Sequence, residues 1–149
     1  MRRSIVAVLA LGVATGCVSH PVGPARTFDT YEDKAATTAE AALSAVSTTI
    51  LAAQVGSDGN ASGPYLSILI SEQEDDLTAV QGTFASIQPP DDRSDALRRQ
   101  LDDILTPAVE HVADVRLTVR RGRLDDLAAV AEPLDDDQRQ LRAFLDGHQ

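Results

Sequence analysis

The chain has 149 residues, a single cysteine, no tryptophan and a formal net charge of −10 at pH 7. This length suits one domain with a core of its own, and one cysteine excludes an intramolecular disulfide. A surface with this excess of acidic residues repels nucleic acid and anionic lipid headgroups. We therefore expect no nucleic acid among the partners of the protein.

The first residues have the three-part layout of a secretory signal. Arg2 and Arg3 supply positive charge, residues 5–13 form an uninterrupted apolar run, and small residues follow at 14–16. The apolar run is far shorter than the roughly 20 residues that a membrane-spanning helix needs. We therefore expect residues 1–16 to be a cleaved export signal and not a permanent membrane span.

The sequence Ala14-Thr15-Gly16-Cys17 resembles a lipobox, the processing site of bacterial membrane lipoproteins. The resemblance covers residues 1–17 only, and it departs from the commonest pattern, which has Leu where Ala14 stands. It implies cleavage between Gly16 and Cys17, a diacylglyceryl group on the Cys17 thiol and, often, acylation of the new amino terminus. The alternative is ordinary signal peptidase, which also accepts Ala14 and Gly16 and would release a soluble protein.

Lipid on Cys17 would hold the mature chain on the extracytoplasmic face of the cell membrane. Each buried methylene contributes about 0.8 kcal/mol, and two acyl chains hold far better than one. Without residues 1–16, the chain keeps 11 basic and 23 acidic side chains, a net charge of −12. Residues 17–26 contain two prolines and a glycine, which predicts a short tether between the lipid and the folded domain.

Four helical segments are predicted in the domain at 27–147. The first two cover about residues 28–53 and 65–87, and Pro64 stands at a favourable first position of the second. The connection between them, Asp58 to Gly63, matches the first half of a calcium-binding EF-hand loop. Leu69 stands where such a loop needs its bidentate Glu, so this segment predicts a plain connection.

The third segment starts at a cap that can be Asp91, Asp92 or Ser94 and reaches about residue 121, and the fourth covers about residues 124–145. Gly122 between them can adopt the left-handed backbone that ends a helix, and the fourth segment keeps a regular a/d alternation of apolar residues. Short connections between helices of similar length predict an all-α domain with the up-down-up-down topology of an antiparallel four-helix bundle.

Two prolines lie inside predicted helices, Pro107 in the third and Pro133 in the fourth. Each removes one backbone hydrogen bond and is expected to bend its helix. The alternative for the fourth segment is a break at Glu132, with Pro133 opening a new helix before the acidic run 135–137.

Polar residues on the apolar stripes are the candidate site. Gln73 and Gln138 predict either a polar layer that fixes the helix register or a small-ligand pocket between the helices. His111 and Asp114 form a possible His–carboxylate pair of the kind that binds metal or moves protons. The plainer interpretation is a partly buried histidine paired with its neighbour on the same helix.

Other acidic residues are expected on solvated faces, chiefly the runs at 72–76 and 135–137. A weak divalent-cation surface is the alternative if carboxylates from different helices converge. The sequence has no Glu-x-x-His pair of the di-iron bundles and no motif that places a nucleophile beside a base. We therefore expect no metal site, no cofactor, no catalytic residue and no enzymatic activity.

These observations predict a membrane-anchored extracytoplasmic lipoprotein whose helical bundle is an interaction module for an envelope protein. The alternative is an envelope receptor that binds a small ligand or cation between its helices. An interaction module should expose a contiguous apolar or ridged surface on the folded bundle. A receptor should show a cavity lined by Gln73, Gln138 or His111.

Overall fold

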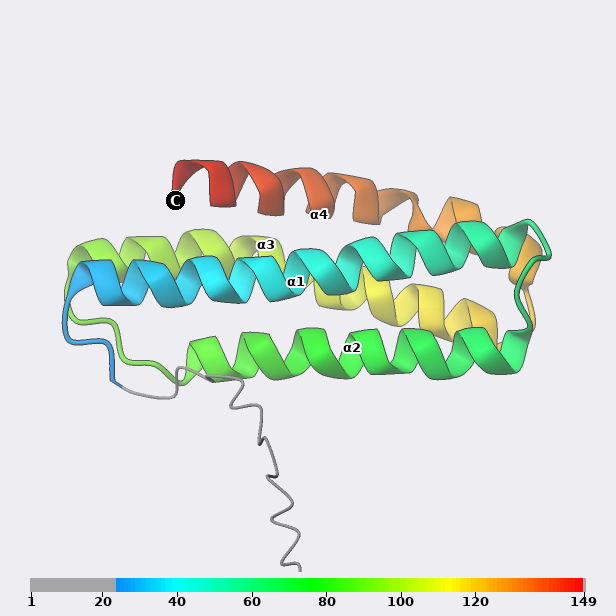
Figure 1. Cartoon of the computed structure of the whole chain (residues 1–149), viewed down its shortest axis with the longest axis horizontal. Coiled ribbons are helices and arrows are strands. Elements are labelled where there is room, and N and C mark those ends of the chain that lie inside the picture. The colour runs from blue at the N-terminus through cyan, green and yellow to red at the C-terminus, as the bar shows by residue number, and fades with distance from the viewer. Residues whose placement is uncertain (1–23, 149) are drawn as a thin grey trace, which may run out of the picture.

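Four long helices pack side by side in the computed structural model, which describes residues 24–148 (Figure 1). They are α1 (Phe28–Ser57), α2 (Gly63–Ala85), α3 (Asp92–Arg120) and α4 (Leu127–Gly147), and the 3₁₀ turn η1 (Leu124–Asp126) precedes α4. The described residues contain no strand. The predicted all-α class and a four-helix bundle are therefore confirmed. The export signal and the part of the tether before residue 24 lie outside the described residues.

Side chains cap the starts of α1 and α3. The Thr27 hydroxyl accepts a hydrogen bond from the backbone N–H of Thr30 at 3.3 Å. At α3, the Asp91 carboxylate accepts from both the backbone N–H and the hydroxyl of Ser94, at 2.8 and 2.7 Å. The bond from the Ser94 N–H is the main reason that the pKa of the Asp91 carboxyl lies below its usual range.

Two glycines in the left-handed region follow the ends of α1 and α3. Gly59 has φ 72° and Gly122 has φ 70°. The residue after each glycine donates its backbone N–H to a carbonyl near the end of the helix. At α1, Asn60 donates to the Val55 carbonyl at 3.0 Å. The stop after α3 was predicted at Gly122. The prediction for α1 was too short, because α1 continues to Ser57.

Neither proline interrupts its helix. Pro107 lies inside α3 and Pro133 lies inside α4, which is one helix throughout. The alternative in which the fourth helix breaks at Glu132 is therefore wrong. The carbonyl of Ala129 lacks the bond that residue 133 would give it, and both residues are exposed, so water can replace that bond.

Small residues let α1 approach its neighbours closely. Most of its buried side chains are alanines, and at Gly56 even one added Cβ would lie 2.7 Å from Leu66 Cδ1 and 2.8 Å from Leu127 Cδ1. This contact brings together the end of α1, the start of α2 and the start of α4. None of the described helices combines the length and the hydropathy needed to cross a membrane.

The other end of α1 packs through an aromatic pair. The rings of Tyr31 and Phe84 lie 5.2 Å apart between centroids, and both side chains are fully buried. The Tyr31 hydroxyl has no hydrogen-bond partner. Its pKa is raised above the ordinary value of 10.0, mainly because burial disfavours the charged phenolate.

Candidate functional site

His111 pairs with a carboxylate on another helix. Its Nδ1 lies 2.7 Å from Oδ2 of Asp137 on α4, and the Asp137 side chain is only 3% exposed. The predicted partner, Asp114, is exposed to solvent. The predicted His111–Asp114 pair is therefore wrong: the α3 surface that carries His111 packs against α4, whereas Asp114 faces outward.

A second polar contact joins α4 to α1. Gln138 donates from Nε2 to the Ser47 hydroxyl at 2.8 Å, and that hydroxyl donates to the Leu43 carbonyl at 2.6 Å. Gln73 instead donates to the Leu69 carbonyl of its own helix, at a long 3.5 Å. No hydrogen bond joins the two glutamines, so the structure does not bring them together into one hydrogen-bonded layer.

A third contact joins α2 to α3. The Arg116 guanidinium donates to both carboxylate oxygens of Glu74, with Nη2 at 3.3 Å from Oε1, and both side chains are about four-fifths buried. Glu74 and Asp137 were expected on solvated faces, and for these two residues that expectation is wrong. Each of these two carboxylates lies in a contact between helices, where it pairs with a basic side chain far away in the sequence.

These three contacts lie on separate seams and do not form a common site. They tie α2 to α3, α3 to α4 and α4 to α1, so they oppose sliding of one helix along the next. Among residues 24–148, no group of three or more His, Cys, Asp or Glu side chains is placed to hold a metal ion. The arrangement supports a structural role for the polar residues that the sequence singles out.

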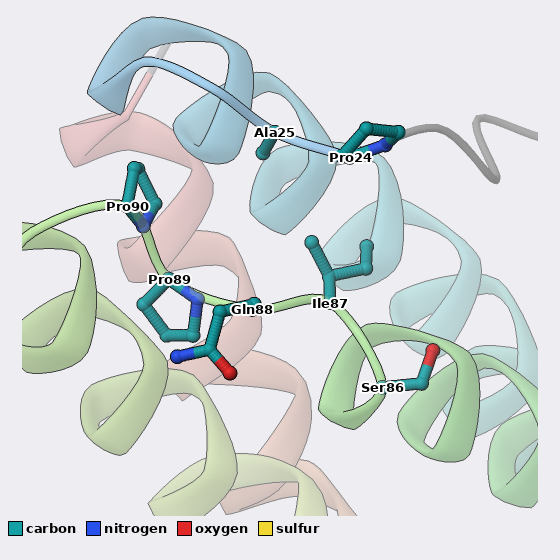
Figure 2. A pocket seen from close by; sticks show the side chains of 7 residues that line it. All are labelled: Pro24, Ala25, Ser86, Ile87, Gln88, Pro89 and Pro90. Atoms are coloured by element: carbon teal, nitrogen blue, oxygen red, sulfur yellow. The ribbon is translucent and has the colours of Figure 1, made fainter.

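A pocket of about 440 Å³ lies at the end of the bundle where the tether joins it (Figure 2). Pro24 and Ala25 form one side, and the loop Ser86–Pro90 forms the other. A smaller pocket of about 150 Å³ lies between α1 and α4, lined by Ile50, Gln54, Ala128, Ala131, Glu132 and Asp135. Neither pocket contains Gln73, Gln138, His111 or Asp114, as the predicted receptor cavity would require.

Three large apolar side chains are exposed on α1 and α2. Leu51 is 60%, Tyr65 59% and Ile68 65% exposed. All three lie in residues 41–71, a stretch of 31 residues in which Asp58 is the only charged residue. By contrast, 22 of the 57 residues at 92–148 are charged. The exposed residues therefore lie in a part of the chain that is unusually poor in charge.

We name this region the uncharged α1–α2 surface. We define it by eight exposed or half-exposed residues of the stretch: Ala41, Ser44, Thr48, Leu51, Val55, Ala61, Tyr65 and Ile68. α1 and α2 are packed neighbours, and the surface extends toward the loop between them. The tether joins the opposite end of α1 (Figure 1), which lies ~20 Å from Ala41 and ~40 Å from Val55 along the helix.

Sequence reasoning did not identify this surface. A signal for it was present in the sequence, because residues 41–71 carry only one charge, Asp58, in an otherwise strongly acidic chain. No family model, curated protein or solved structure matches the chain. Gly16 and Cys17, the predicted cleavage and lipidation residues, lie outside the described residues.

Proposed function

We propose that the protein is an exported lipoprotein, held on the extracytoplasmic face of the cell membrane by lipid on Cys17, whose bundle is an interaction module. One observation carries the interaction role, namely the uncharged α1–α2 surface with its exposed Leu51, Tyr65 and Ile68. Large apolar side chains exposed in one part of the chain are a mark of contact sites in proteins. The centres of protein interfaces are likewise depleted in charge and enriched in aromatic residues such as Tyr65.

The anchor is supported by the residues at the amino terminus. The Arg pair, the short apolar run and the small residues before Cys17 fit an export signal with a lipidation site. A tether over residues 17–26 could lift the domain by at most ~3.1 Å per residue. The tether joins the start of α1, so an anchored bundle would hold the loop end of the uncharged α1–α2 surface away from the membrane and leave the surface on the side of the bundle.

We further propose that the helices alternate in direction, in the up-down-up-down topology. The connections support this, because 58–62 and 86–91 are too short to run back along a helix of ~35 Å or more. The contact of Gly56 with Leu66 and Leu127 supports it as well. So does the hydrogen bond at 2.7 Å that Arg98, near the start of α3, donates to the carbonyl of Ala85 at the end of α2.

The anchor is tested by the mass of the amino-terminal peptide of the mature protein, taken from the membrane fraction. We expect a peptide that begins at Cys17 and carries a diacylglyceryl group, and a Cys17→Ala variant that is no longer retained by lipid. An unmodified Cys17 thiol would refute the anchor.

The interaction role is tested by a photo-crosslinking amino acid placed at Tyr65 in intact cells that produce the protein. The matched control places it at Glu110, an exposed residue of α3. We expect a discrete crosslinked species from position 65 and none from position 110. Without a crosslinked species from position 65, or with the same species from both positions, the uncharged α1–α2 surface is not the contact site.

A further inference from the structure

We infer that the uncharged α1–α2 surface binds the same surface of a second copy of this chain. This inference rests on the proposed interaction role and names its partner. The contact would be isologous, so that each residue pair across it occurs twice around a two-fold axis.

The distribution of charge favours a second copy. Residues 24–148 carry a net charge of −12, of which the 31 residues at 41–71 contribute only the single charge of Asp58. Two copies that approach through other parts of the bundle bring the acidic excess of each against that of the other. Within the uncharged α1–α2 surface no acidic side chains oppose each other, and the like charges that approach are those at its edge, so self-repulsion is smaller there than elsewhere on the bundle.

The side chains on the surface suit a contact between helices. Ala41, Ser44 and Thr48 form a row of small residues on α1, over which a helix of the partner can approach closely. Leu51, Tyr65 and Ile68 stand beyond this row and supply large apolar groups that lose water on contact. The small row therefore allows close approach of the two copies, and the large groups beyond it can bury apolar area against their equivalents.

A basic partner fits this surface less well. The acidic outer residues of α2, Glu72, Asp75 and Asp76, are exposed next to the surface and would attract positive charge to themselves. A partner attracted by charge should thus bind beside the uncharged surface. The surface itself offers only apolar and small polar side chains, which another uncharged surface matches.

The size of the uncharged α1–α2 surface limits how tightly two copies can bind each other. It extends along ~25 Å of α1 and ~13 Å of α2, and with helices ~10 Å wide the pair would bury roughly 800 Å² in total. This is below the range of stable interfaces, so we expect a weak dimer that forms at micromolar concentrations or above. Two copies anchored at the same end also stand parallel, which lets their sides meet.

Sedimentation equilibrium of the mature chain tests the inference, with Cys17→Ser to prevent a disulfide between copies. From about 10 μM to about 1 mM we expect the mean mass to rise from one copy toward two. Raising the salt from about 0.05 M to about 0.5 M should strengthen association, because salt screens the repulsion between acidic copies.

Two variants locate the contact. Ile68→Glu places a carboxylate in each half of the interface, and we expect a monomer at every concentration. Ala143→Glu adds the same charge on an exposed position near the end of α4, outside the uncharged α1–α2 surface, and should associate like the parent chain. Circular dichroism checks that both variants keep the helix content of the parent.

A parent chain that stays monomeric at ~1 mM overturns the inference, as does equal loss of association in both variants or association that weakens with salt. The proposed interaction role can be tested separately from the dimer. If position 65 crosslinks to a different protein in cells while the purified chain is monomeric, the interaction role holds and the second copy is wrong. If position 65 crosslinks to nothing, the interaction role itself fails.

Discussion

The stretch 41–71 and the pair α3–α4 bury similar inner faces but differ on the outside. In α3 and α4 the inner residues are apolar and many outer residues are charged, as in an ordinary amphipathic surface helix. In 41–71 the outer residues other than Asp58 are small, polar without charge, or apolar, and Leu51 and Ile68 are chemically the same as core residues. A helix that is apolar on two sides is typical of one that packs on both. The contrast therefore points to α1 and α2 as the elements with a second contact to make.

The largest expected difference in stability is between alanine substitutions at two isoleucines of α2. Ile70 is fully buried and Ile68 is 65% exposed. Ile70→Ala should lower the free energy of unfolding by about 2–5 kcal/mol, because it removes buried methyl groups and leaves a cavity. Ile68→Ala should change it by less than about 0.5 kcal/mol, since its side chain is already in water. Urea unfolding at low protein concentration measures both, and similar losses would show that the outer surface is packed within a single copy.

The next largest difference in stability is expected between a buried and an exposed carboxylate of α4. Asp137 is buried against His111, whereas Asp136 pairs with Arg139 on the surface. Asp137→Ala should cost about 1–3 kcal/mol because it leaves the His111 ring without its partner in a seam between helices. Asp136→Ala should cost less than about 1 kcal/mol, as exposed ion pairs contribute little. Thermal unfolding compares the two, and equal stability would contradict the structural role of the His111–Asp137 pair.

Two helical glycines should respond in opposite directions to the same substitution. Gly56→Ala places a Cβ against Leu66 and Leu127, so we expect a net loss of about 1–2 kcal/mol after the gain in helix propensity. Gly82 has open space around it, and Gly82→Ala should raise stability by about 0.5–1 kcal/mol. Chemical denaturation gives both signs. A stabilising Gly56→Ala would mean that α1 does not approach its neighbours as closely as described.

The smallest effect concerns the buried hydroxyl of Tyr31. Tyr31→Phe removes an O–H without a hydrogen-bond partner and should raise stability at neutral pH by about 1 kcal/mol. The raised pKa of Tyr31 adds a dependence on pH. Above pH 10 the unfolded chain releases this proton more readily than the folded chain does, so the parent loses stability as the pH rises through the folded pKa. Tyr31→Phe should lose less over the same range in thermal unfolding scans, and identical losses would contradict the burial of the hydroxyl.

Much of the fold could be predicted from sequence because the signals that end a helix are local. Pro64, Gly122 and the prolines at 89–90 mark boundaries within a few residues. The end of α1 was misplaced because Gly56 and Gly59 both offer a stop, and only packing against Leu66 shows that Gly56 lies inside the helix.

The candidate site was less predictable, because its contacts are not local. Asp137 lies 26 residues from His111, so the sequence offered Asp114 as the nearer partner. Ser47 and Gln138 are 91 residues apart, and only the bundle brings them together. The exposure of Leu51 and Ile68 could not be read from residue type, since both look like core residues. The missing charge around them is the signal that a sequence alone provides.

The central claim is that the uncharged α1–α2 surface is covered in the cell. The most direct measurement is the rate at which a water-soluble thiol reagent modifies an Ile68→Cys variant in intact cells and as dilute purified protein. An Ala143→Cys variant on α4 is the control. We expect position 68 to react several-fold more slowly in cells than in dilute solution, and position 143 to react at the same rate in both. Equal rates at position 68 in the two settings would contradict the claim.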